Sequence, residues 1–213
     1  MKVLIVGDVH GCYYSFKKLL KEYWNPEDTL LVQLGDLVNK GPHSAKCLKK
    51  CIKLSKAYPH LVYFLIGNHE YILRENLRLY GVPKGMDVLR KDMIKYNISN
   101  STLMIWIDGL STVWENNNIH ISHAGIGKKA TTPLDLPRES SIINNRKALR
   151  NIGKLQITGH VIQENGVVYS PKENAWHIDT GAYLGNGLSA ILINYDGTKA
   201  KSITVPTSPK DLV

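Results

Sequence analysis

The stretch "GDLVNKG" at residues 35–41 directly follows an apolar run, "TLLVQL". The same order of apolar run and polar turn occurs twice more, with "GDVHG" at 7–11 after "KVLIV" and "GNHE" at 67–70 after "LVYFLI". Continuous apolar runs of this kind are typical of strands buried on both faces. Two segments with apolar residues at helical spacing separate the three runs, which predicts a β-α-β-α-β order and a parallel sheet.

The remainder of the chain is predicted to be mainly helical at first and then rich in short strands. Residues 70–100 have a helical pattern, interrupted at "YGVPKG". The polar segment 127–151 is predicted to be a loop with a short helix near 146–151. We expect one α/β domain over residues 1–205 and a trailing tail at 206–213. Later strands are expected at 103–107, 110–115, 119–122, 155–158, 175–178 and 188–195.

Composition and charge indicate a soluble protein with an anionic partner. The 213 residues are 43% hydrophobic and carry a formal net charge of +9. The apolar runs are far shorter than the roughly 20 residues of a membrane-spanning helix, and the first of them is too short for a signal peptide. We therefore expect a cytoplasmic protein that does not contact membranes, and we expect a monomer. The positive charge favours a phosphorylated protein or a nucleotide as the substrate.

Two lysine-rich segments, "FKKLLKEYW" and "KCLKKCIKLSK", account for part of this charge. No aromatic residues alternate with these lysines along the sequence, so we interpret them as solvent-exposed helix faces and expect nucleic acid only as a substrate. Cys47 and Cys51 have the spacing of one helix face. We interpret them as small apolar fillers rather than as a disulfide or a metal pair.

Several polar side chains follow the ends of predicted strands. In a parallel sheet, side chains beyond the carboxyl ends of the strands converge on one edge, where ligands bind. An isolated Gly-Asp pair is usually a turn and an isolated histidine is usually structural, but five strand ends with ligating side chains indicate a metal centre. The mixture of carboxylate, imidazole and amide oxygen suits Mn, which we prefer, or Fe or Zn, better than Mg or Ca. The candidate ligands of two divalent ions are Asp8, His10, Asp36, Asn68, His123 and His160.

The motifs "GDVHG", "GDLVNKGP", "GNHE", "SHAG" and "GH", in this order, resemble the phosphoprotein phosphatase family of calcineurin-like metallophosphoesterases. The resemblance covers residues 3 to about 195, and "HIDTGAYLGNGLSAI" resembles a late segment of bacterial members. It implies an α/β fold with a central β-sandwich flanked by helices in α-β-β-α layers. It also implies a dinuclear metal centre, with Asp8, His10 and Asp36 on one ion. Asp36, Asn68, His123 and His160 would bind the other.

In a centre with two cations, we expect a water that bridges the metals to attack the phosphorus atom of the substrate. His69 follows the ligand Asn68, and both the sequence and the resemblance point to His69 as the general acid that protonates the leaving oxygen. Asn68 is also expected to contact the substrate phosphate. Arg146 matches the family's phosphate-binding arginine, with Arg150 and Arg138 as alternatives.

Asn39 and Lys40 stand where most relatives have Asp-Arg. Lys40 keeps the positive charge but lacks the planar fork of arginine, so it should hold phosphate less firmly. Asn39 can orient His69 by a hydrogen bond, but it cannot stabilise the charged ring as a carboxylate does. The departure is either tolerated drift or an adaptation to another substrate.

Two enzymatic functions and one non-enzymatic function are considered. The first is hydrolysis of phosphomonoesters, including phosphoserine and phosphothreonine. The alternative is hydrolysis of nucleoside polyphosphates, such as dinucleoside tetraphosphates or an RNA cap, because "GDLVNKGP" and "HAGI" resemble the diadenosine tetraphosphatase branch. A binding module with a dead site is disfavoured, since all the expected ligands and His69 are present. The loops at 75–100 and 127–145 are expected to set specificity.

Overall fold

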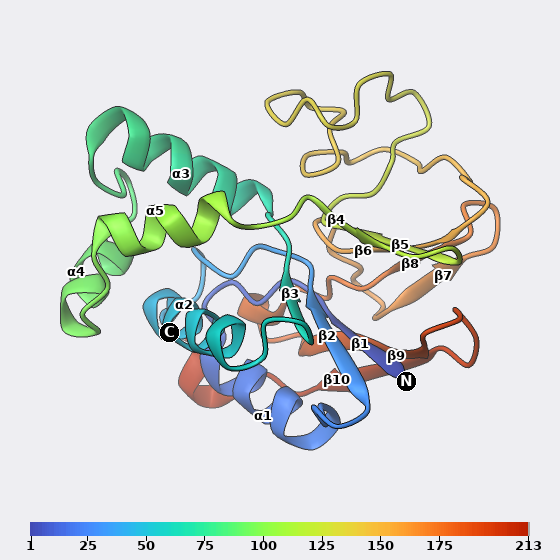
Figure 1. The fold of residues 1–213 in the computed structure, drawn as a ribbon, viewed down its shortest axis with the longest axis horizontal. Coiled ribbons are helices and arrows are strands. Elements are labelled where there is room, and N and C mark those ends of the chain that lie inside the picture. Colours follow the sequence, from blue (N-terminus) through green and yellow to red (C-terminus); the bar gives the residue numbers. More distant parts are fainter. Residues whose placement is uncertain (213) are drawn as a thin grey trace.

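The computed structural model describes residues 1–212 and contains two five-stranded sheets that face each other (Figure 1). The first sheet has the order β10-β9-β1-β2-β3, in which β1, β2 and β3 are parallel. The second has the order β4-β5-β6-β8-β7, in which β5, β6 and β8 are parallel. The strands are β1 Lys2–Val6, β2 Thr29–Gln33, β3 Val62–Phe64, β4 Val113–Glu115, β5 Ile119–Ser122, β6 Leu155–Thr158, β7 Val168–Ser170, β8 Ala175–His177, β9 Leu188–Asn194 and β10 Lys201–Val205.

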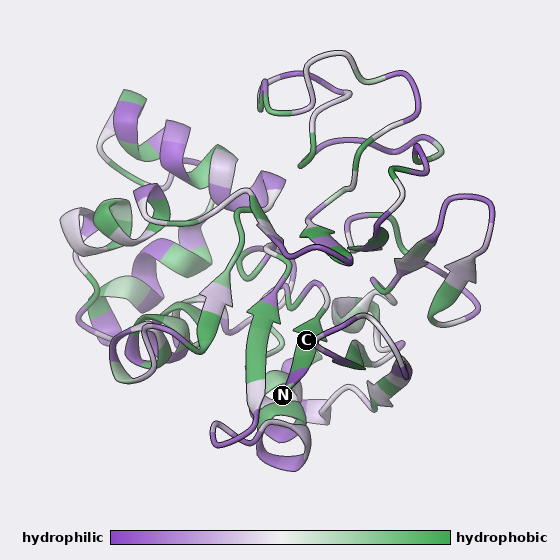
Figure 2. Cartoon of the chain, turned by 45° about the vertical axis from the view of Figure 1, so that its right-hand side comes forward, coloured by the Kyte–Doolittle hydropathy of each residue, from purple (hydrophilic) through white to green (hydrophobic). Residues whose placement is uncertain are grey.

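The core lies on both faces of the first sheet, as its continuous apolar strands predict. Val3 and Ile5 of β1 belong to a cluster with Ile121 and Ile157 of the second sheet. The intervening residue Leu4 belongs to a separate cluster with the helices. This alternation follows from the period of two along a strand. Figure 2 shows hydrophobic residues concentrated in the central strands, with hydrophilic residues on the outer parts of the helices.

Five α-helices flank the sandwich, and this arrangement confirms the expected fold class (Figure 1). Two helices cover the outer face of the first sheet, where Phe16 and Leu48 are fully buried. The other three lie to one side of the sandwich. The interruption expected at "YGVPKG" separates α3 from α4. The helices are α1 Tyr13–Tyr23, α2 Ser44–Ala57, α3 Asn68–Tyr80, α4 Asp87–Lys95 and α5 Asn100–Asp108, with short 3-10 turns at Ala182–Leu184 and Pro209–Asp211.

The strand expected at 103–107 is wrong, because these residues belong to helix α5. The Ser99 hydroxyl accepts a hydrogen bond from the backbone N–H of Thr102 at the start of the helix. Leu103 and Ile107, one helical turn apart, are then both buried. Periodicity does not distinguish a strand from a buried helix in so short an apolar run.

The short helix expected near 146–151 is also absent, because this segment is extended beside residues 126–128. The N–H of Arg150 donates to the carbonyl of Ile126, and that of Lys128 donates to Ala148. Strands β7 and β10 were not expected from the sequence. Both are edge strands, and their few inward-facing residues give a weak pattern.

The 3-10 turn at Pro209–Asp211 contacts helix α1. Both oxygens of the buried Asp211 carboxylate accept hydrogen bonds from the start of helix α1, at 3.0 Å from Tyr14 N and 2.7 Å from Ser15 N. The carboxylate therefore satisfies backbone donors that the helix itself leaves without a partner.

Cys47 and Cys51 are buried and unpaired, and they line the helix–sheet core as apolar fillers. Within residues 1–212, no helix has the combination of length and apolar character that crossing a membrane requires.

Candidate active site

The carboxyl ends of five strands meet at one edge of the sandwich. Strand β1 leads to Asp8 and His10, β2 to Asp36, and β3 to Asn68 at the first turn of α3. The second sheet adds two histidines, one after β5 and one after β6. The structure thus brings together the side chains proposed as metal ligands: Asp8, His10, Asp36, Asn68, His123 and His160.

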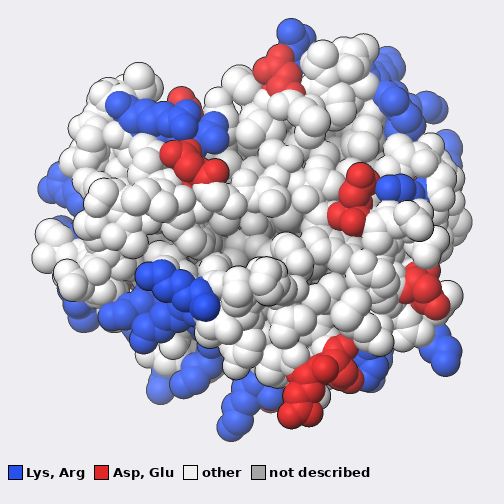
Figure 3. All heavy atoms as spheres, in the orientation of Figure 1, with Lys and Arg blue, Asp and Glu red and all other residues white. Residues whose placement is uncertain are grey.

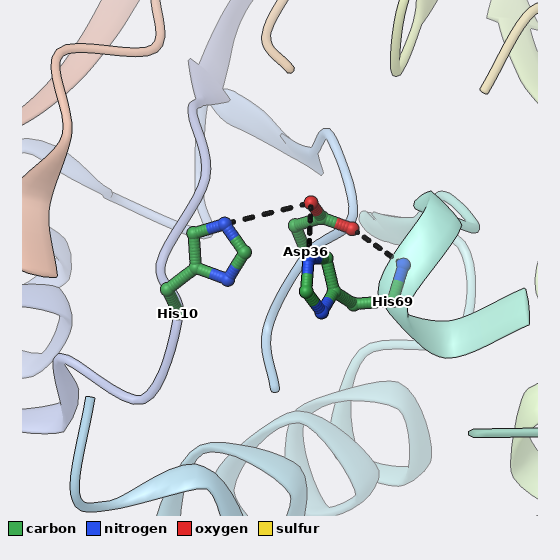
Figure 4. Close-up of side chains that lie close together, drawn as sticks. All are labelled: His10, Asp36 and His69. Carbon is green, nitrogen blue, oxygen red and sulfur yellow. Dashed lines mark hydrogen bonds and ion pairs between the residues drawn. The ribbon is translucent and has the colours of Figure 1, made fainter. Parts of the chain in front are cut away.

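The Asp36 carboxylate lies at the centre of this group. Its Oδ2 atom is 3.5 Å from His10 Nε2, 3.4 Å from His123 Nε2 and 3.9 Å from His69 Nε2. Figure 4 shows His10 and His69, from different elements, directed toward Asp36. Two sets of potential ligand atoms, each within 4.8 Å of one another, share this residue: His10, Asp36 and His69, and Asp36, His123 and His160. One carboxylate is therefore placed to contact two cations.

Two further atoms of the site are buried without any hydrogen-bond partner. They are Asp8 Oδ1 and His160 Nε2. A buried polar atom without a partner is costly, so such atoms need another ligand. Asn68 Oδ1 lies 3.1 Å from His123 Nε2 and contributes an amide oxygen to the same group. These oxygen and nitrogen donors fit divalent Mn, Fe or Zn.

Electrostatics also favour bound positive charge. Burial raises the pKa of Asp8 well above its usual value, and Asp179 and Asp36 add to this effect. Burial would lower the pKa of His123, but Asp36 and Asp8 outweigh it and raise that pKa to about 10.

Several site residues have a left-handed backbone. The φ angle is 42° at His10, 53° at Asp36 and 67° at His160, and it is 68° at both Asn39 and Lys40. This region is uncommon for residues other than glycine. Such strain concentrates at functional sites, where the surrounding structure holds it in place.

Glu70, the last residue of "GNHE", holds the turn that carries Asp36, a role that the sequence analysis missed. Its fully buried carboxylate accepts hydrogen bonds from the backbone N–H groups of Asp36, at 2.7 Å, and of Leu37, at 2.9 Å. Burial and the charge of Asp36 raise the pKa of Glu70 to about 7. Its place in the third motif was the signal that could have identified it.

Two glycines leave room for the carboxylates that we expect to bind metal. A Cβ atom at Gly67 would collide with the side chain of Asp36, and one at Gly159 would collide with the side chain of Asp8. The two carboxylates therefore occupy space that only glycine leaves free.

His69 lies at the edge of the centre and contacts Asn39. Its Nδ1 atom is 2.9 Å from Asn39 Nδ2, as expected from the sequence. The His69 backbone N–H donates to Asp36 Oδ1 at 2.9 Å, which fixes the start of α3 against the centre. Burial lowers the pKa of His69 to about 4, and Asp36 opposes this shift only in part.

Tyr183 is a second residue that the sequence analysis missed. Its ring packs edge-on against His10, with 5.2 Å between the ring centroids, and the Lys40 ammonium lies 5.9 Å from the centroid of the same ring. Tyr183 thus contacts both Lys40 and His10, one of the candidate metal ligands. It belongs to the "HIDTGAYLGNGLSAI" segment, whose resemblance to bacterial members was the available signal.

A cavity of about 910 Å³ adjoins Asn68 and His160, and the segment 137–147 forms its other wall. Arg138 and Arg146 both line this cavity. In Figure 3 the surface is hollowed between the α3 side and this loop side. Arg150 is directed elsewhere, because its Nη2 donates to the carbonyl of Ala130 at 2.6 Å. Arg138 already pairs through its Nε with the Asp135 carboxylate. The structure therefore favours Arg146 as the candidate phosphate ligand, with Arg138 as the second candidate.

Comparisons with known proteins identify relatives of this chain. Symmetrical bis(5'-nucleosyl)-tetraphosphatases from Buchnera aphidicola and Haemophilus ducreyi are 32% and 29% identical, over 61% and 67% of this chain. The chain spans about half the length of these relatives, 46% and 53%.

Two solved structures share the fold. One, provisionally described as a diadenosine tetraphosphatase, has a TM-score of 0.67 and 22% identity, covering 98% of this chain and 94% of that one. A serine/threonine phosphatase from Saccharomyces cerevisiae has a TM-score of 0.71 and 17% identity, covering 98% of this chain and 81% of that one. The family model for calcineurin-like phosphoesterases matches residues 1–184. The chain therefore belongs to the calcineurin-like phosphoesterase family.

Proposed function

We propose that the chain is a metal-dependent hydrolase of nucleoside polyphosphates, with dinucleoside tetraphosphates as the first substrates to test. The observation that carries the metal-dependent chemistry is the position of Asp36 in both groups of potential ligands. The sequence alone ranks phosphomonoesters first, but the relatives are named as tetraphosphatases, and they favour the alternative. The basic charge of the chain is consistent with a substrate that carries several phosphates.

The metal centre would hold two divalent ions, for which we propose Mn. Asp8, His10 and Asp36 would bind one ion, and Asp36 would share the second with Asn68, His123 and His160. Bound metal supplies Lewis acidity and lowers the pKa of water. The chain itself holds the ligands at fixed separations, because Glu70 and the two glycines determine where the carboxylates lie.

We assign His69 as the general acid and Asn39 as the residue that orients it. The amide of Asn39 holds His69 Nδ1, and Nε2 is directed toward the centre, 3.9 Å from Asp36. An amide cannot stabilise the charged imidazole as a carboxylate does. This weaker support suits an anhydride, because a phosphate leaving group is far less basic than an alkoxide and needs less proton donation.

Positive side chains lie around the place where we propose that the substrate phosphates bind. Arg146 and His160 line the same cavity. Burial, together with the charges of His123 and Arg146, lowers the pKa of His160 to about 3. Lys40 approaches from the Tyr183 side. We propose that Arg146, Lys40 and Asn68 bind the phosphate that is attacked, and that Arg138 contacts a more distant part of the substrate.

A panel of three substrates tests the proposed function. The Mn-loaded protein should hydrolyse diadenosine tetraphosphate with a kcat/KM at least about tenfold above that for a phosphoserine peptide or an aryl phosphate, because positive residues line an extended cavity. Steady-state assays at equal protein concentration give the three values. A higher kcat/KM for the phosphopeptide would support phosphomonoester hydrolysis and contradict the proposed hydrolysis of nucleoside polyphosphates.

Replacing the amide with a carboxylate tests the role of Asn39. Asn39→Asp should increase turnover of the phosphoserine peptide by up to about tenfold and change turnover of the dinucleotide little, since only the alkoxide needs strong acid assistance. Asn39→Ala serves as the control, because it removes the hydrogen bond without adding charge. Equal effects of Asn39→Asp on both substrates would show that this residue does not act through His69.

Arg146 and Arg150 provide a variant and its matched control. Arg146→Ala should raise the KM for diadenosine tetraphosphate about tenfold or more, because charge-assisted hydrogen bonds to phosphate are lost. Arg150→Ala removes the same charge four residues away, but this guanidinium already binds the carbonyl of Ala130, so KM should not change. A larger effect at Arg150 than at Arg146 would overturn the assignment.

A further inference from the structure

Helix α2 forms one wall of a second, basic cavity that is separate from the proposed active site. This cavity of about 440 Å³ is lined by side chains of three helical regions, and we call it the α2 groove. Figure 3 shows a concentration of Lys and Arg over the region of α2. The residues that line the groove are Tyr13, Lys46, Lys49, Lys50, Lys53, Leu54 and Tyr96.

The four lysines of the groove share one helix face. Lys46, Lys49, Lys50 and Lys53 follow the spacing i, i+3, i+4, i+7 and extend over about 10 Å of the helix axis. Like charges at these spacings repel one another and destabilise a helix. Within residues 1–212, none of the four forms an ion pair with a carboxylate. Lys46 Nζ donates to the Tyr14 hydroxyl at 3.1 Å and Lys49 Nζ to the Tyr96 carbonyl at 3.2 Å. These neutral partners leave the positive charges without a counter-charge, which a bound anion would supply.

Aromatic rings from other helical regions lie beside two of these lysines. The Lys46 ammonium is 5.8 Å from the centroid of Tyr13 and 4.8 Å from that of Tyr14, and Lys49 is 5.7 Å from that of Tyr96. Tyr13 and Tyr14 belong to α1, and Tyr96 follows α4. The sequence shows no alternation of basic and aromatic residues, but the packing of three helices places tyrosine rings against Lys46 and Lys49.

We propose that the α2 groove binds single-stranded nucleic acid through its phosphates, without base specificity. Lysines act as point charges on a phosphate backbone, and tyrosine rings offer surfaces on which bases stack. The groove contains no arginine, asparagine or glutamine, the side chains that read base edges in pairs of hydrogen bonds. The groove combines a row of lysines with tyrosine rings. A flexible nucleic-acid strand can use both, through its phosphates and its bases, whereas an acidic protein segment has no bases to stack on the rings.

Binding to a labelled 20-nucleotide oligo(U) tests this proposal. Fluorescence anisotropy with the full chain in EDTA measures binding without turnover, so the result does not depend on the proposed hydrolase function. Lys49→Glu/Lys53→Glu changes two exposed residues of the groove and should weaken binding at least about tenfold. It should also reduce the slope of log Kd against log salt by about 1.4, since each lost phosphate contact accounts for about 0.7 on single strands.

A matched control distinguishes the groove from the general charge of the protein. Lys199→Glu/Lys201→Glu makes the same charge change at exposed positions near strand β10 and should leave binding within about twofold. Tyr96→Leu keeps apolar bulk but removes the ring, and should weaken binding about tenfold through lost stacking. Equal weakening by both lysine pairs, no binding of oligo(U), or groove-dependent binding only to an acidic peptide or to phosphatidylserine vesicles would each overturn the proposal.

Discussion

The buried carboxylate of Asp36 is the constraint on which the rest of the site depends. It lies where the ends of two sheets meet, and imidazole nitrogens of His10, His69 and His123 lie within 4 Å of its Oδ2 atom. Glu70 holds its backbone, Gly67 leaves space for its side chain, and its own φ angle of 53° is in the left-handed region. Backbone strain concentrates at functional sites. The strained and buried position of Asp36 is therefore consistent with a ligand that two metal ions share.

Both sheets of the sandwich are needed to build this centre. The first sheet supplies the residues that follow β1, β2 and β3, and the second supplies His123 and His160. The apolar layer between the sheets, with Ile5 and Ile157 among its members, fixes the distance between the two halves of the site. Metal that binds only the assembled ligands would therefore also stabilise the packing of the two sheets against each other.

The sequence predicts the part of the structure that depends on local pattern. Continuous apolar runs before Gly-Asp and Gly-Asn turns are sufficient to place Asp8, Asp36 and Asn68 on one edge. The helix at 100–108 is not predictable in this way, because its apolar run is short and its Ser99 cap is a weak signal. Tyr183 and the α2 groove depend on contacts between elements far apart in the chain, and no local pattern shows such contacts.

Anomalous scattering from Mn-loaded crystals is the most direct test of the central claim. We predict two peaks per chain, both next to the Asp36 carboxylate. One set should be completed by Asp8 and His10, and the other by Asn68, His123 and His160. A single peak, or two peaks that do not share Asp36, would contradict the account.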